Sequence, residues 1–123
     1  MNKKSVSAIS GIGIDIIEVT RIKKIFRKHP AFLKRFFTPE EITYCLNGEN
    51  KYERIAARFA AKEAVIKALD MKTLRLKDIS VSKAGTGRPG VVLAGVKFKN
   101  TRIMLSLTHT PVCACAVAVA EGI

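Results

Sequence analysis

The sequence has no apolar run long enough to cross a membrane as a helix, which takes about 18 or more consecutive apolar residues. Its N-terminal stretch, MNKKSVSAISGIGIDII, places basic residues ahead of an apolar segment, as a signal peptide does. Glycines and Asp15 interrupt that segment, however, and no small-residue cleavage pattern follows it. We therefore expect a cytoplasmic protein with no membrane span.

Cysteine is also scarce, and the three examples are Cys45, Cys113 and Cys115. An odd and sparse set of this kind does not favour a disulfide framework. Cys113 and Cys115 lie two apart in a strand-like run, and together with His109 they suggest a metal site. A fourth ligand is missing, however, and the spacing fits no zinc pattern. We interpret the cysteines as small buried thiols.

Acidic residues are few, 10 against 22 lysines and arginines, and the formal net charge is +12. Such an excess attracts nucleic acid, phosphate-rich small molecules, acidic proteins or anionic membranes. Between Val19 and Pro39 there are seven basic residues and no acidic one, which favours an acidic partner for this stretch. The seven are Arg21, Lys23, Lys24, Arg27, Lys28, Lys34 and Arg35.

The order of predicted elements indicates a single α+β domain over residues 1–123. An N-terminal strand in SGIGIDIIEV is followed by several helices, including one long helix at about 51–70. Short strands in DISVSKA, VVLA, RIMLSLTH and VCACAVAVA then predict an antiparallel meander. One helix is well marked, because Thr38 can cap it, Pro39 fits its first position and Glu41 completes a capping box. Glu41 is thereby explained without a function.

The N-terminal strand places one carboxylate beside glycines. Ile12, Ile14 and Ile16 alternate onto one face, and Gly11, Gly13 and Asp15 alternate onto the other. The glycines leave room for another part of the molecule to approach the backbone closely. Because the run is otherwise so apolar, we expect Asp15 to be a partnered carboxylate and not a solvent-facing one.

The long helix places a second carboxylate in its apolar stripe. On a helical wheel Glu63 falls on the same side as Phe59 and Ile66, which is the side that we expect to be buried. Burial of an unpaired carboxylate is costly, so Glu63 needs a cation, hydrogen-bond donors or a metal. An ion pair with Lys67, one turn further on, is the simplest partner.

Asp15 and Glu63 together suggest a different partner. Two carboxylates with waters and substrate phosphates are the usual ligands of Mg²⁺, and nearby cations suit a pyrophosphate. Those cations are Arg58, Lys62 and Lys67. A carboxylate pair for glycoside hydrolysis is the other possibility, but the same cations argue against it.

The segments GIGIDIIEVTRI, RFAAKEAVIKAL, GTGRP and LSLTHT carry a resemblance to a known family. They occur in the order and at the spacing of the holo-acyl-carrier-protein synthases, the short 4′-phosphopantetheinyl transferases of bacterial fatty acid synthesis. The four motifs span residues 11–110, nearly the whole chain. The resemblance implies transfer of 4′-phosphopantetheine from coenzyme A to a serine of apo acyl carrier protein, with release of 3′,5′-ADP. It also implies a homotrimer with active sites between subunits.

The resemblance also implies roles for individual residues. The positions that match Asp15 and Glu63 bind Mg²⁺ in the family, and the one that matches Lys67 lies near the bridging phosphates. The position that matches Arg21 contacts the acidic helix of the carrier protein. We expect Lys67 to neutralise or protonate the departing phosphate, and Glu63 or a water molecule to accept the serine proton.

The motifs further predict contacts to coenzyme A. His109 can be a loop histidine satisfied by backbone groups, or it can bind a phosphate or ribose of coenzyme A; we expect binding in preference to base catalysis. The predicted coenzyme A residues are Arg58, Lys62, Gly87, Pro89, Ser106 and His109.

A basic nucleic-acid-binding module is the alternative function, prompted by a sequence pI near 10.0. It predicts exposed aromatic side chains among the basic residues. Phe26, Phe32, Phe36 and Phe37 do lie in the basic stretch, but their spacing fits the inward faces of short helices. This alternative also leaves Asp15 without a purpose.

Overall fold

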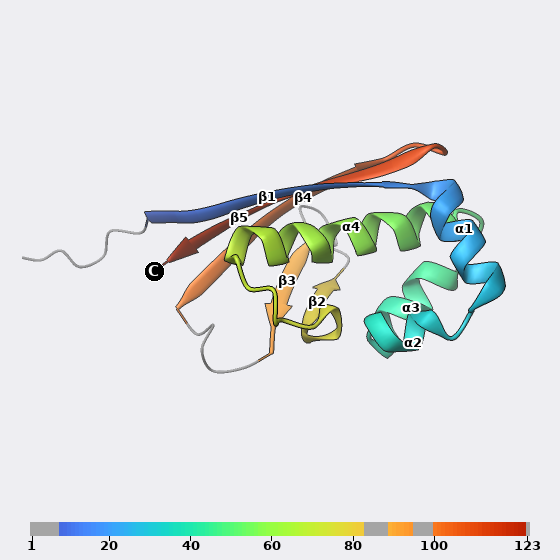
Figure 1. Ribbon diagram of the computed structural model, residues 1–123, viewed down its shortest axis with the longest axis horizontal. Coiled ribbons are helices and arrows are strands. Elements are labelled where there is room, and N and C mark those ends of the chain that lie inside the picture. The colour runs from blue at the N-terminus through green and yellow to red at the C-terminus, as the bar shows by residue number, and fades with distance from the viewer. Residues whose placement is uncertain (1–7, 83–88, 95–99, 123) are drawn as a thin grey trace, which may run out of the picture.

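The computed structural model describes residues 8–82, 89–94 and 100–122, and the fold is α+β as predicted. One long helix, α4 (Lys51–Leu69), packs along one face of a three-stranded sheet (Figure 1). The strands of that sheet are β1 (Ala8–Glu18), β4 (Thr101–His109) and β5 (Cys113–Gly122). The long helix begins and ends close to the bounds of about 51–70 that the sequence predicts.

The sheet is not the simple meander that the sequence predicts. Its order is β1-β5-β4, so the N-terminal strand pairs with the C-terminal one, and both pairings are antiparallel. A second antiparallel sheet contains only β2 (Ile79–Ser82) and β3 (Gly90–Leu93). Pairing across such a long sequence separation leaves no local signal, which is why the strand pattern alone suggested consecutive neighbours.

The shorter helices lie between β1 and α4 in the chain and gather at one end of the molecule (Figure 1). They are α1 (Val19–Lys28), α2 (Phe32–Phe36) and α3 (Pro39–Leu46), and a 3₁₀ turn, η1 (Leu76–Asp78), precedes β2. The predicted capping box of α3 is present: Glu41 N donates to Thr38 Oγ1 at 3.3 Å, and Thr38 N donates to Glu41 Oε1 at 2.8 Å. No helix within the described ranges is long and apolar enough to cross a membrane.

The core lies between α4 and the sheet and is built largely from small residues. Alanines of α4 and alternate alanines of β5 are buried there. Glycines of β1 bring the two layers still closer, because a Cβ at Gly11 would lie 1.8 Å from the Ala68 carbonyl oxygen. The approaching group that the glycines predicted is therefore the backbone of α4. The alanines are Ala57, Ala60, Ala61, Ala64 and Ala68 of α4, and Ala114, Ala116, Ala118 and Ala120 of β5.

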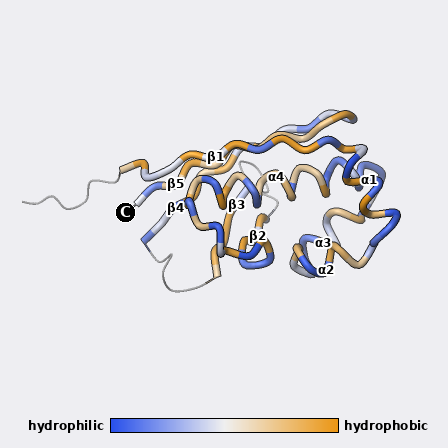
Figure 2. Tube along the Cα trace, in the orientation of Figure 1, coloured by the Kyte–Doolittle hydropathy of each residue, from blue (hydrophilic) through white to orange (hydrophobic). Residues whose placement is uncertain are grey.

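The opposite face of the sheet is apolar and exposed. Ile12, Ile14 and Ile16 are 68%, 62% and 65% exposed, and no described element covers them. By strand register they lie beside Val119, Val117 and Cys115 of β5. Hydrophobic residues recur along β1, whereas strongly hydrophilic ones are mixed into α1 (Figure 2). Cys45 is buried as predicted, but Cys113 and Cys115 are only partly buried, because they point to this outer face.

Candidate active site

Asp15 and Glu63 line one cavity of about 220 Å³ between β1, α1 and α4. Arg21 of α1 lines the same cavity, with an apolar wall that includes Ile25 and Phe59. The close packing of β1 on α4 brings the two carboxylates together, because Asp15 follows Gly13 by two residues on the same face of the strand. The structure thus brings together the two carboxylates and the arginine that the sequence singled out.

Lys67 pairs with Asp15 and not with Glu63. Its Nζ lies 3.2 Å from Asp15 Oδ1 and donates to the Ile14 carbonyl oxygen at 2.9 Å. The simple expectation of a Glu63–Lys67 ion pair is therefore wrong. The other Asp15 oxygen, Oδ2, is buried and has no hydrogen-bond partner in the described part of the chain. A buried carboxylate oxygen in that situation can serve a cation or a donor from outside the chain.

Glu63 is partly buried, and among the described residues none forms a hydrogen bond or ion pair with its carboxylate. Burial raises the pKa of Glu63, and the neighbouring charge of Asp15 raises it further, whereas Lys67 acts to lower it. The two carboxylates are thus close enough to repel each other. A cation between them would remove that repulsion.

The donor set suits Mg²⁺ better than a metal that needs several protein ligands. The described residues contain no cluster of three or more histidine, cysteine, aspartate or glutamate side chains able to hold a metal. Two carboxylates with open space beside them match Mg²⁺, which keeps several waters and takes further oxygens from substrate phosphates. Asp15 and Glu63 therefore fit this ion, and the unpartnered Asp15 Oδ2 is the observation that supports the fit.

The side of α4 that bears Glu63 is less buried than the helical wheel predicted. Phe59, Glu63 and Ile66 are all only partly buried, whereas the alanines that face the sheet are buried. The wheel weights large apolar side chains, whereas close packing against glycine and alanine strands needs small ones. This error matters for function, because a partly open side lets a ligand reach Glu63.

Lys62 does not line the site. Its side chain is fully buried, and its ammonium lies 2.6 Å from Glu41 Oε1 and donates to the carbonyl oxygens of Phe36 at 2.8 Å and Leu76 at 3.1 Å. Three partners satisfy its three donors, so the expected contact to coenzyme A is replaced by a structural role. Desolvation lowers the pKa of Lys62, and the Glu41 carboxylate opposes that shift.

Glu41 has a role that the sequence did not reveal. Besides capping α3 and pairing with Lys62, it accepts a hydrogen bond from Val81 N at 2.7 Å. One buried carboxylate thus joins α3, α4 and β2. The capping box accounts for Glu41 from the local sequence alone. Its partners Lys62 and Val81 lie on other elements, so no local pattern predicts them.

Arg58 is buried, with 5% of its surface exposed, and its guanidinium lies over the Tyr44 ring at 4.3 Å from the centroid. It lines a cavity of about 320 Å³ with Ser80 and Ser82 of β2. Its Nε has no hydrogen-bond partner among the residues described. Arg58 therefore lies apart from the carboxylate pair, at a cavity that also holds hydroxyl groups.

His109 lies beside the first turn of α4. Its Nδ1 is 2.7 Å from Glu53 Oε1, in the first turn of the helix. Glu53 and Glu63 are ten residues apart on α4, which at roughly 1.5 Å per residue is about 15 Å along the axis. Within one chain His109 is therefore not part of the carboxylate cavity. Glu53 is a residue that the sequence analysis did not identify.

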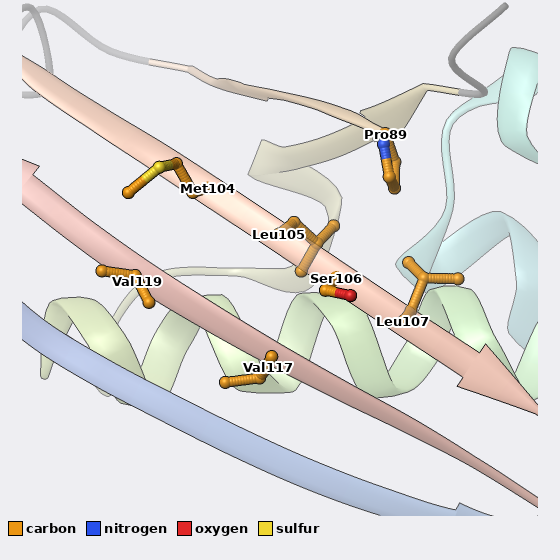
Figure 3. Close-up of a pocket in the computed structure, with 7 residues that line it drawn as sticks. All are labelled: Pro89, Met104, Leu105, Ser106, Leu107, Val117 and Val119. Atoms are coloured by element: carbon orange, nitrogen blue, oxygen red, sulfur yellow. The ribbon is translucent and has the colours of Figure 1, made fainter. Parts of the chain in front are cut away.

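Pro89 and Ser106 line a third space, a groove of about 510 Å³ along the edge strand β4 (Figure 3). Pro89 lies just before β3, Ser106 belongs to β4, and Val117 and Val119 of β5 form part of the apolar wall. Gly87 lies outside the described residues. The predicted coenzyme A residues thus fall on several faces of a single chain.

Comparison with known proteins identifies relatives of this chain. Residues 11–116 match the family described as the 4′-phosphopantetheinyl transferase superfamily. The chain is 41% identical to the holo-[acyl-carrier-protein] synthase of Clostridium kluyveri over 121 residues, which cover 92% of this chain and 90% of that protein. It is 46% identical to the holo-[acyl-carrier-protein] synthase of Thermodesulfovibrio yellowstonii over 103 residues, which cover 82% of this chain and 88% of that one.

Solved structures agree with this relationship. The holo-(acyl-carrier-protein) synthase of Bacillus anthracis in complex with CoA (3′,5′-ADP) aligns with a TM-score of 0.80 at 36% identity, covering 94% of this chain and 98% of that one. The Helicobacter pylori holo-[acyl-carrier-protein] synthase in complex with coenzyme A aligns with a TM-score of 0.80 at 37% identity, covering 89% and 98%.

Proposed function

Because the chain belongs to the holo-[acyl-carrier-protein] synthases of the 4′-phosphopantetheinyl transferase superfamily, we propose that it modifies an apo acyl carrier protein in fatty acid biosynthesis. The serine oxygen of the carrier attacks the phosphorus next to pantetheine in coenzyme A. The bond from that phosphorus to the bridging oxygen breaks, and 3′,5′-ADP leaves. The observation that carries this proposal is the shared cavity of Asp15, Glu63 and Arg21.

Mg²⁺ held by Asp15 and Glu63 belongs to the same proposal. When bound, the ion would polarise the diphosphate and screen its charge from the incoming serine oxygen. The unpartnered Asp15 Oδ2 and the absence of any described partner for the Glu63 carboxylate support this assignment.

The remaining side chains of the cavity supply charge and proton transfer. Lys67, whose side chain is about half exposed, can turn from Asp15 toward a phosphate and neutralise the charge that develops on the departing group. Glu63 or a water molecule accepts the serine proton.

The basic stretch provides the docking surface for the carrier protein. Arg21 is exposed on α1 and lines the carboxylate cavity, so an acidic protein bound there would bring its serine to the metal ligands. Surface cations of this kind speed the encounter with an acidic partner more than they strengthen the final complex.

The alternative of a nucleic-acid-binding module finds little support in the aromatic residues. Phe37 is fully buried, Phe32 is 7% exposed and Phe36 packs edge-on against Phe59. Phe26 packs edge-on against Tyr52. These rings therefore pack against other aromatic rings and leave no row of free faces for bases.

We further propose a homotrimer in which active sites form between subunits. The exposed isoleucines of β1, with Val117 and Val119 of β5, make a continuous apolar sheet face of the kind that marks an interface. The dispersal of Arg58, Pro89, Ser106 and His109 over separate faces also favours sites completed by a neighbouring subunit. A cytoplasmic location belongs to the same proposal, because coenzyme A and acyl carrier protein are its substrates.

The transfer reaction is tested by incubation of the protein with apo acyl carrier protein, coenzyme A and Mg²⁺, followed by mass measurement of the carrier. We expect the carrier to gain the mass of one phosphopantetheine group. A carrier that keeps its mass under these conditions would refute the proposed function.

A further inference from the structure

The pair of Glu53 and His109 joins the first turn of α4 to the last residue of β4. The two residues are 56 positions apart in the chain, and Glu53 Oε1 lies 2.7 Å from His109 Nδ1. The turn after His109 does not depend on the ring, because the Thr110 hydroxyl accepts from Val112 N at 3.1 Å and Cys113 N at 3.2 Å. The His109 ring therefore takes no part in forming the turn, and its contact is with Glu53.

The chemistry of the pair determines which ring nitrogen carries the proton. A carboxylate only accepts hydrogen bonds, so a short contact to Glu53 requires a proton on Nδ1. Nε2 is then the atom left for other partners, and no described residue hydrogen-bonds to it. The His109 side chain is 36% exposed and that of Glu53 only 18%, so the free nitrogen is the part of the pair that a ligand can reach.

We propose that Glu53 is the positioning residue of His109: it holds the proton on Nδ1, fixes the ring plane and leaves Nε2 as the acceptor for a hydroxyl group of coenzyme A, such as the ribose hydroxyl. This inference rests on the proposed function for the identity of the ligand. It goes beyond the family resemblance, which gave His109 a place near coenzyme A and gave Glu53 no role. A carboxylate behind a histidine commonly fixes the tautomer and orientation of a binding or catalytic ring.

The tautomer can be observed directly, because the chain contains only two histidines, His29 and His109. His29 is exposed, and no described residue hydrogen-bonds to its ring, so it serves as an internal reference. We expect two-bond ¹⁵N–¹H correlation spectra of the intact, ligand-free protein, taken above the range in which histidine ionises, to show the proton of His109 on Nδ1. A His109 ring with its proton on Nε2 would overturn the proposal, whatever the enzyme does.

Variants separate positioning from general stability. Glu53→Ala should release the His109 tautomer and raise the KM for coenzyme A roughly tenfold, with kcat little changed. Glu53→Gln keeps an acceptor oxygen and should retain most of both properties. Glu49→Ala is the matched control, because it removes the same charge from an exposed position near the start of the helix. A Glu53→Ala protein with wild-type tautomer and wild-type KM would also refute the proposal.

The two levels of the proposal fail in different ways. If the carrier gains no phosphopantetheine, the proposed function is wrong, while the ligand-free tautomer still reports on Glu53. If transfer is normal but the Glu53→Ala protein binds coenzyme A as the wild type does, the function stands and the positioning role is wrong.

Discussion

Gly13 of β1 lies directly against Ala64 of α4, so that a Cβ on the glycine would be 2.0 Å from the Ala64 carbonyl oxygen. The same added Cβ would also lie 2.8 Å from Lys67 Cβ. Two residues later in β1 comes Asp15, and one position before Ala64 in α4 comes Glu63. The close contact of strand and helix is therefore what brings the two carboxylates into one cavity.

Substitution of Gly13 by alanine should damage both stability and the site. The added methyl group meets backbone atoms that cannot yield, so we expect a loss on the order of 3 kcal/mol in the free energy of unfolding. Chemical denaturation measures this loss. Gly122→Ala is the control, because a Cβ there meets nothing within 4 Å. Equal stability of the two variants would show that strand and helix are less tightly packed than this contact requires.

The raised pKa of Glu63 predicts a pH-dependent gain in stability when its charge is removed. A carboxyl group whose pKa is higher in the folded protein favours folding below its unfolded-state pKa. That contribution is lost as the pH rises through the folded-state value. Without metal, Glu63→Gln should therefore be more stable than the wild type at pH 7–8, and the difference should shrink at pH 4 and below. Thermal unfolding in the presence of a chelator measures it, and a variant less stable than the wild type at pH 8 would contradict the assigned shift.

Lys67 should act on turnover more than on binding. Lys67→Ala removes a charge that answers the departing phosphate, so we expect kcat to fall roughly 100-fold with a smaller change in the KM for coenzyme A. Steady-state kinetics distinguish the two. Lys72→Ala, at an exposed position beyond the end of α4, controls for the loss of net charge. A rise in KM alone would make Lys67 a binding residue.

The buried pair of Glu41 and Lys62 should be needed for folding stability. Glu41→Gln leaves an ammonium without its counter-charge in the interior, and we expect a loss of about 3 kcal/mol in the free energy of unfolding. Thr38→Ala, which removes only one half of the capping box, should cost about 1 kcal/mol. If urea denaturation gave the two variants the same small loss, the ion pair would contribute little.

Charge reversal at Arg21 should weaken the carrier protein interaction and leave coenzyme A binding alone. We expect Arg21→Glu to cost roughly 2 kcal/mol in the kcat/KM for the carrier, because repulsion is added to the lost attraction. Rising salt should slow the wild type and slow the variant less. Lys72→Glu reverses a charge at the far end of α4 and should have little effect. Unaltered carrier kinetics in the Arg21→Glu enzyme at low salt would place the docking surface elsewhere.

The sequence predicted those features of the site that depend on local pattern. Alternation in β1 placed Asp15 on the face with the glycines, and helical spacing placed Glu63 on one side of a long helix. The face of Asp15 was predicted correctly because it needs only the geometry of one strand, whereas the side of α4 that bears Glu63 is more open than the wheel predicted. The strand order was predicted incorrectly because β1 and β5 pair from opposite ends of the chain.

Partners on distant elements were beyond reach for the same reason. Glu41 bonds to Val81, 40 residues away, and Glu53 bonds to His109, 56 residues away. No periodicity links such positions, so Lys62 was predicted to contact coenzyme A beside the carboxylate pair, and Glu53 was overlooked. The domain prediction over residues 1–123 stays a prediction.

The most direct test of the central claim is the Mg²⁺ dependence of transfer, followed by the mass of the carrier protein in wild type and Glu63→Gln. Glutamine keeps the volume of the side chain and removes the charge that would hold the ion. We predict that the wild-type carrier product appears only with Mg²⁺, and that the folded variant gives no product at ordinary Mg²⁺ concentrations. Near-normal product formation by Glu63→Gln at those concentrations would contradict the claim that Asp15 and Glu63 form the metal site.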